Sequence, residues 1–327
     1  MGTVTDTVTA TGKQQTSRGP SVRLQRILAF ILLLAQGGIT VTGSIVRVTG
    51  SGLGCDTWPN CQEGSLVPVA GAAPAIHQAI EFGNRLLTFV LAAIAIAVFV
   101  AVLRAGRRRE IVVYSLISGL GIVLQAVLGG ISVILDLQWW TVAIHFLPSM
   151  ILVWIAALLY MRLAEPDDGQ PVRMFPQSIR TMTVIAAVAL SVVLITGTMV
   201  TGAGVHSGDA GVGMEGRLEV DIELMAYIHA ATMYLYLAAT ALVTWQLHRR
   251  NAPQAALRTA YVLIAMIFVQ WAIGIIQFNL GIPRWTVPAH IAMSSVVVAF
   301  SAFLYAHGKR RVSPAPVTPK ADANAPG

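Results

Sequence analysis

Charged residues are scarce in this chain of 327 residues, and their scarcity excludes an ordinary soluble domain. They make up 11% of the sequence, whereas hydrophobic residues make up 55%; in an average globular domain about a quarter of the residues are charged. Runs without charge recur, and each is long enough to cross a hydrocarbon layer of about 30 Å. Cysteine is scarce as well, and the two that are present cannot build a zinc site alone.

The uncharged runs predict an all-α integral membrane protein, because lipid offers no partner to an unpaired backbone group. Eight transmembrane helices are expected over residues 24–46, 77–103, 111–134, 141–163, 181–203, 223–247, 259–280 and 286–307. Most arginines and lysines fall at alternate helix ends, and the opposite loops hold only Arg47, Arg217 and Arg284. The positive-inside rule then predicts that both termini are cytoplasmic. The net charge of +7 is spread along these membrane edges, so a nucleic acid is not an expected partner.

A repeat relates the two halves of the chain at an offset of 145 residues. The segment from Gln125 to His145 matches the segment from Gln270 to His290 at Gln, Gly, Trp, Thr, Val and His, without a gap. Each half has four spans, an even number, so the repeat is parallel and predicts two four-helix bundles. The expected division is a disordered cytoplasmic N-terminus, a first bundle, a cytoplasmic linker, a second bundle and a disordered cytoplasmic tail, at 1–23, 24–163, 164–180, 181–307 and 308–327.

Three histidines occupy repeat-related positions inside these bundles. The same offset carries His229 back to Asn84, so each half has two matched positions and three of the four are histidine. Histidine inside an apolar bundle is costly and usually functional, and a pair on two helices is a typical axial ligand set for haem iron. The alternative is histidines that only form hydrogen bonds within the bundle.

The N-terminal half departs from this symmetry, since Asn84 is a poor iron ligand. Glu81, one turn earlier, and the adjacent Arg85 have only alanines at the matching positions of the second half. A five-coordinate iron near a carboxylate suits oxygen chemistry, whereas an iron held by two histidines suits electron transfer. The alternative is that Glu81 and Arg85 form an ion pair that only fixes helix packing. His77, two turns before Asn84, could reach a haem edge, but an interfacial histidine is the simpler interpretation.

The two cysteines, Cys55 and Cys61, lie in the first outer loop. The outer face is oxidising and the loop is short, so a disulfide is expected. A metal-binding or redox-active thiol pair is the alternative.

Taken together, these motifs resemble the haem A synthase family, membrane enzymes that convert haem O to haem A for cytochrome oxidase. The resemblance covers residues 24–307, and its most specific parts are Thr42-Gly43 through Cys55, then Trp58-Pro59, Cys61, Glu81, Arg85, His145, His229 and His290. It implies oxidation of the C8 methyl of haem O to a formyl group, haem b as cofactor on His229 and His290, and substrate haem in the N-terminal half. It also implies a catalytic carboxylate at Glu81 and an outer-loop disulfide.

The chain departs from the family pattern Glu-x-x-His-Arg at Asn84, which leaves His145 as the only matched histidine of the substrate site. Either one histidine suffices there, which we favour, or His77 substitutes, or this half has lost activity. The leading expectation is an oxidoreductase of the cell membrane acting on haem O. Its expected partners are haem O synthase, cytochrome oxidase assembly factors, an unidentified electron carrier and membrane lipid. The alternatives are a b-type cytochrome that passes electrons from quinol, and a haem or lipid transporter.

Overall fold

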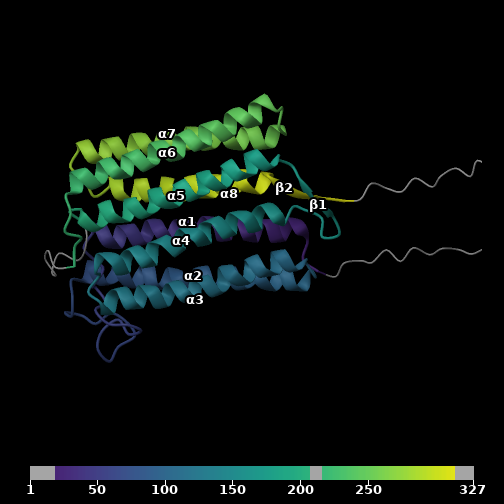
Figure 1. The fold of residues 1–327 in the computed structure, drawn as a ribbon. Helices are drawn as coiled ribbons and strands as arrows, with labels where there is room; N and C mark the ends of the chain where they lie inside the picture. Colours follow the sequence, from purple (N-terminus) through teal and green to yellow (C-terminus); the bar gives the residue numbers. More distant parts are fainter. Residues whose placement is uncertain (1–18, 207–215, 314–327) are drawn as a thin grey trace, which may run out of the picture.

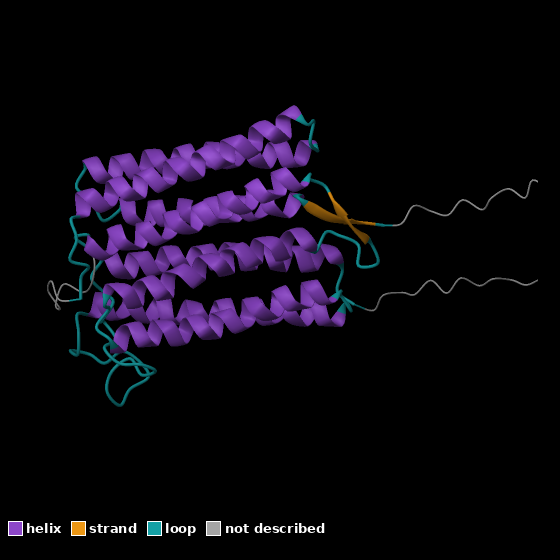
Figure 2. Ribbon diagram, viewed as in Figure 1, coloured by secondary structure: helices purple, strands orange, loops and turns teal. Residues whose placement is uncertain are grey.

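The computed structural model describes residues 19–206 and 216–313, which form eight α-helices and one two-stranded sheet (Figure 1; Figure 2). The segments 1–18 and 314–327, for which disorder was expected, lie outside the described residues. The helices are α1 (Val22–Val48), α2 (Ala75–Arg104), α3 (Arg109–Ile134), α4 (Trp139–Arg162), α5 (Gln177–Ala203), α6 (Ile222–Arg249), α7 (Gln254–Asn279) and α8 (Thr286–His307). The strands are β1 (Gln170–Arg173) and β2 (Lys309–Val312).

All eight helices are long and apolar enough to cross a membrane, so this is a multi-pass membrane protein. The eight predicted spans are confirmed, and every end agrees within five residues. Local sequence sets several helix starts. Ser21 and Asp221 accept hydrogen bonds from backbone N–H groups in the first turns of α1 and α6. Pro74, Pro176 and Pro253 directly precede α2, α5 and α7, where the missing N–H of proline costs nothing.

The helices group into two sets of four (Figure 1). In the first set, α1 and α3 each pack against both α2 and α4; in the second, α5 and α7 each pack against both α6 and α8. Within each set, α2 and α4, or α6 and α8, therefore lie diagonally opposite. The sets meet along α4 and α8, with α1 against α8 and α4 against α5. That the two sets are repeats of one another stays a prediction of the sequence offset.

The two ends of the helix bundle differ. The loop between α1 and α2 lies at one end, while the loop between α2 and α3 lies at the other end together with the sheet (Figure 1). Both described chain ends also lie at the sheet end (Figure 1), as expected for an even number of spans. We call the end with the α1–α2 loop the outer end, following the predicted orientation.

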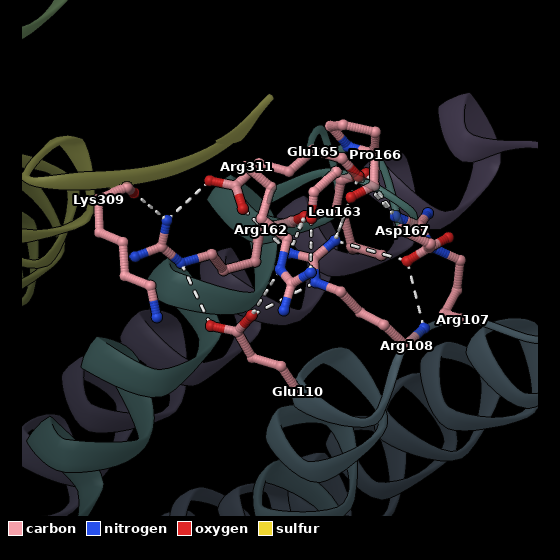
Figure 3. A network of polar contacts seen from close by, with 11 residues as sticks. Arg107, Arg108, Glu110, Arg162, Leu163, Glu165, Pro166, Asp167, Lys309 and Arg311 are labelled. Carbon is pink, nitrogen blue, oxygen red and sulfur yellow. Dashed lines mark hydrogen bonds and ion pairs between the residues drawn. The ribbon is translucent and has the colours of Figure 1, made fainter. Parts of the chain in front are cut away.

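An ion-pair network closes the sheet end of the first bundle (Figure 3). Arg108 pairs with Glu165 at 3.0 Å, and Arg162 pairs with the same carboxylate at 2.7 Å. Arg107 donates to the backbone carbonyls of Leu163 and Glu165 just beyond α4, where carbonyls lack helical partners. The network therefore joins the α2–α3 loop to the end of α4.

The sheet corrects one expectation from the sequence. Residues 308–327 were expected to form a loose tail, but Lys309–Val312 pairs as β2 with β1 from the linker, antiparallel, with Gln170 opposite Val312. Arg162 also donates to the carbonyl of Lys309. The two strands pair over a sequence separation of 136 residues or more. Four mostly exposed residues show no alternation of apolar and polar side chains, so the sequence pattern could not predict β2.

Candidate haem-binding and catalytic site

The histidines of the C-terminal half face each other across their bundle. His229 on α6 and His290 on α8 have ring centroids 6.4 Å apart, with the ring planes inclined at 63°. Two metal–imidazole bonds of about 2 Å each, plus the distance from each nitrogen to its ring centre, come to a similar separation. Both rings are only partly buried. The pair can therefore hold one metal ion between them.

A hydroxyl group orients His229. Thr196 Oγ1 on α5 lies 3.1 Å from His229 Nδ1, and it also lies 3.0 Å from the carbonyl oxygens of Val192 and Val193. Because the hydroxyl hydrogen goes to a carbonyl, we assign Nδ1 of His229 as a donor to Thr196. The lone pair of Nε2 is then available to a metal. A hydrogen bond from the other ring nitrogen commonly fixes the tautomer and orientation of a ligating histidine in this way.

Glycines on neighbouring helices lie against all three histidine rings. A Cβ atom added at Gly129, Gly197 or Gly274 would come within 3.2 Å, 3.1 Å and 3.4 Å of Cε1 in His145, His229 and His290, respectively. The first two distances are tighter than ordinary contacts, so a side chain there would push the ring. Gly129 and Gly197 thus leave room for the rings of His145 and His229, a role beyond the helix packing that such residues commonly serve.

The N-terminal half repeats the hydroxyl contact without the second histidine. Thr42 Oγ1 on α1 donates to Asn84 Oδ1 on α2 at 2.7 Å. This contact between α1 and α2 corresponds to the contact of Thr196 with His229 between α5 and α6. This leaves the amide nitrogen of Asn84 as a donor. His145 stands on α4, diagonally opposite α2, and its Nδ1 is buried without a hydrogen-bond partner in the described part of the chain.

Glu81 is buried and fully engaged at the outer end of α2. Its side chain is 6% exposed. One carboxylate oxygen accepts from the backbone N–H of Cys55 at 2.7 Å, and the other accepts from Arg85 at 2.6 Å. A buried ion pair is seldom retained for stability alone. Glu81 therefore lies directly beneath the outer loop.

Arg85 holds that loop in place through backbone carbonyls. It donates to the carbonyl oxygens of Cys55, Thr57 and Asn60 at 2.8–3.0 Å. The loop is closed by the Cys55–Cys61 disulfide, so the expected pairing is present. The Glu81–Arg85 pair thus anchors a loop, whereas the alternative interpretation from the sequence had it fix helix packing.

The other histidines lie away from these positions or serve as structural links. His77 is in the first turn of α2, where its backbone carbonyl packs against Gly54. His206 Nε2 contacts the carbonyl of Ile282 between two outer loops. His248 contacts the hydroxyl of Tyr261, and His307 contacts the hydroxyl of Thr259, both at the opposite end of the bundle.

The donor set suits haem better than a metal bound by protein alone. No group of three or more His, Cys, Asp or Glu side chains gathers as a metal site within residues 19–206 and 216–313. Haem iron needs only one or two axial ligands from the protein. The opposed rings of His229 and His290, and the buried unpartnered Nδ1 of His290, fit such a group.

Sequence reasoning missed several residues that complete the site. Thr42 and Thr196 lie 154 positions apart and occupy similar places in α1 and α5. This offset differs from 145, because the loops that follow differ in length, and so the repeat does not pair them. The anchoring of the outer loop by Arg85 left no signal in the sequence.

Comparison with known proteins agrees with this arrangement. Residues 26–302 match the model of the COX15-CtaA family, described as cytochrome oxidase assembly protein. A relative from Listeria monocytogenes serovar 1/2a, named "Heme A synthase", is 23% identical over 291 residues, which cover 85% of this chain and 93% of the relative. One of the same name from Bacillus licheniformis is 29% identical over 145 residues, 44% of this chain and 46% of the relative. The match extends over most of the eight helices and includes every site residue described above, so this chain belongs to the COX15-CtaA family of cytochrome oxidase assembly proteins.

Proposed function

We propose that this protein is a haem A synthase, an oxidoreductase that converts the C8 methyl of haem O to a formyl group. The observation that carries the proposal is the asymmetry of the two bundles. One bundle opposes two histidines, while the other combines one histidine with a buried carboxylate and an amide. The names of the relatives point to the same activity.

In this proposal His229 and His290 hold haem b as the resident cofactor. Haem iron with two histidine ligands supplies electron transfer, and haem iron with an open position supplies oxygen chemistry. Thr196 keeps His229 in the ligating tautomer, and Gly197 leaves room for the ring of His229. These residues bind and orient; the oxidation itself belongs to the other bundle.

The N-terminal bundle binds the substrate haem through His145. Asn84 offers its amide N–H from the diagonal helix, held by Thr42. Glu81 can take a proton from the reacting methyl or hydroxymethyl group, or stabilise positive charge that develops there. Arg85 and the disulfide loop above Glu81 limit the access of water from the outer end.

The net change is a four-electron oxidation: with water as the source of the oxygen, a methyl group and one water molecule give a formyl group, four protons and four electrons. The electrons leave through an unidentified carrier, and the substrate comes from haem O synthase in the same cell membrane. The lipophilic substrate and product fit a protein embedded in the bilayer, with both termini in the cytoplasm.

Co-expression with a source of haem O tests the proposal. Haems extracted from the membranes and separated by chromatography should include haem A when this protein is present. A matched strain with His145→Ala should contain only haem O and haem B. Absence of haem A with the wild-type protein, despite abundant haem O, would refute the activity. The same extraction separates the main alternative, a b-type cytochrome, which would carry haem B and form no formyl-bearing haem.

A further inference from the structure

Gln125, in the middle of α3, has a buried amide group that nothing satisfies. Both its amide nitrogen and its amide oxygen are buried without a hydrogen-bond partner among the described residues. An unpaired polar group in an apolar interior costs about 1–3 kcal/mol, and a membrane interior holds little water to reduce that cost. Such a group calls for a ligand.

The position of Gln125 is set by its neighbours on the same face of α3. Gly121 lies one turn before it and packs against Leu152 of α4, and Gly129 lies one turn after it and packs against His145. Gln125 therefore lies at the seam of α3 and α4, about 6 Å deeper in the membrane than the level of the His145 ring.

The matching residue of the other half has a partner for its amide nitrogen, and only its amide oxygen lacks one among the described residues. Gln270 donates its amide to Ser294 Oγ at 2.9 Å, and Ser294 in turn donates to the carbonyl of His290. The N-terminal half has the same serine, Ser149, which donates to the carbonyl of His145. Gln125 nevertheless makes no bond to it. Both halves therefore have Gln, Ser and His at these positions, but the hydrogen bond between Gln and Ser forms only in the C-terminal half.

A proline stands beside the serine in only one half. Pro148 precedes Ser149 inside α4 and cannot donate a backbone hydrogen bond. Its counterpart in α8 is Met293, next to Ser294. The helix that carries the serine thus lacks one backbone donor at this level in the half assigned to the substrate.

Haem O and haem B differ at the place where such an amide would matter. Haem B carries an apolar vinyl group where haem O carries a hydroxyl-bearing side chain with a long isoprenoid tail. This position is remote from the two charged propionates, which are best solvated at the watery outer end of the bundle. The hydroxyl then points toward the bilayer centre, the direction in which Gln125 lies from His145.

Resting on the proposed function, we propose that Gln125 recognises the hydroxyl group of haem O and so selects substrate over haem B in the N-terminal bundle. A site built to bond a hydroxyl rejects the analogue without it, because its own polar group is left unpaired. In the C-terminal bundle Ser294 accepts from the amide nitrogen of Gln270, so only the amide oxygen of Gln270 lacks a partner among the described residues, whereas Gln125 leaves both amide atoms unpaired.

Titration of purified protein with haem O, haem B and haematohaem tests this. Haematohaem carries hydroxyethyl groups in place of both vinyls and lacks the isoprenoid tail, so it separates the hydroxyl from the tail. The readout is the absorbance of haem bound in a His145-dependent manner. For each protein, the affinity for haem O and the affinity for haematohaem are divided by the affinity for haem B. Both ratios should be about tenfold or more higher in the wild type than in the Gln125→Met variant.

The matched control is Gln270→Met, which removes the twin amide and should leave these affinity ratios at the N-terminal site unchanged. An intact low-spin spectrum from the His229–His290 pair verifies that Gln125→Met is folded. Equal ratios in wild type and Gln125→Met would overturn the proposal, and so would an equal loss in Gln270→Met. A preference for haem O without preference for haematohaem would assign recognition to the tail and also overturn it. None of these outcomes depends on haem A formation, so failure of the proposed activity is detected separately by the extraction experiment.

Discussion

The two bundles differ in how many of their matched polar groups are engaged by their own side chains, and the C-terminal bundle engages more of them. Thr196 holds His229 and Ser294 holds Gln270, each within about 3 Å. On the other side, Thr42 holds an asparagine, and neither amide atom of Gln125 has a partner among the described residues, whereas Gln270 lacks one only at its amide oxygen. The N-terminal bundle thus leaves more hydrogen-bonding groups for a ligand to satisfy.

The outer ends of the two bundles differ in the same sense. Glu81 and Arg85 tie the disulfide loop of the first bundle to α2, while Ala226 and Ala230 stand at the matching positions of α6. Reactive groups are therefore concentrated in one bundle.

The largest expected effect is the loss of the resident haem. His229→Ala or His290→Ala should abolish the low-spin haem b spectrum, because each removes one of the two opposed ligands. Absorption and electron paramagnetic resonance spectra of purified protein measure this. His248→Ala, at the opposite end of the bundle, is the control and should keep the spectrum. Unchanged spectra in both ligand variants would end the assignment.

The next effect contrasts the two matched positions of the substrate bundle. His145→Ala should eliminate haem A formation, since it removes the single axial ligand. Asn84→Ala should reduce formation by about tenfold, the worth of one hydrogen bond, and Asn84→His should be tolerated. Chromatography of extracted haems gives the yields. His77→Ala should have little effect; damage equal to that of His145→Ala would make His77 the missing ligand.

Glu81→Gln should lower haem A formation by about 100-fold while the haem b spectrum stays intact. The change keeps the shape and an acceptor for the N–H of Cys55 but removes the charge, and acid–base catalysis is typically worth that much or more. Limited proteolysis of the outer loop provides the control, because a loosened loop would reveal an anchoring defect. A normal yield would reduce Glu81 to anchoring the loop.

Removal of the disulfide should destabilise the first bundle without affecting the second. Closing so short a loop is worth about 2 kcal/mol in the chain-entropy description. Thermal unfolding of a Cys55→Ser, Cys61→Ser double variant should show this loss with the haem b spectrum retained. In the wild type, thiol labelling of unreduced, denatured protein should find no free cysteine. Two labelled cysteines would contradict the pairing.

The smallest effect separates the two threonines. Thr196→Val should weaken haem b binding by about tenfold, because a hydrogen bond to the second nitrogen of a ligating histidine fixes its orientation. Thr42→Val should leave haem b binding unchanged and affect only the substrate bundle. Competition with apomyoglobin measures retention of the haem. Equal loss of haem b in both variants would refute the division of roles.

Much of the fold could be predicted from hydropathy, because a transmembrane helix needs a long apolar run and leaves a signal in every residue. The helix ends of α3, α5 and α8 agree with prediction to the residue at Ile134, Ala203, Thr286 and His307. Strand β2 could not be predicted, since its four residues pair with a segment remote in sequence. The histidine positions followed from the repeat, whereas Thr196 and Ser294, which support them, did not.

The sequence by itself determined the eight spans, the repeat offset and the types of residue at each matched position. It also determined that Asn84 stands where a histidine would complete the set. Only the tertiary structure decided which of these residues meet. Four helices must pack side by side before Thr42 reaches Asn84, before Arg85 reaches the disulfide loop, and before Gln270 reaches Ser294. Hydrogen bonds require donor and acceptor atoms about 3 Å apart. These partners are remote in sequence, and hydrophobic periodicity cannot predict which of them come that close.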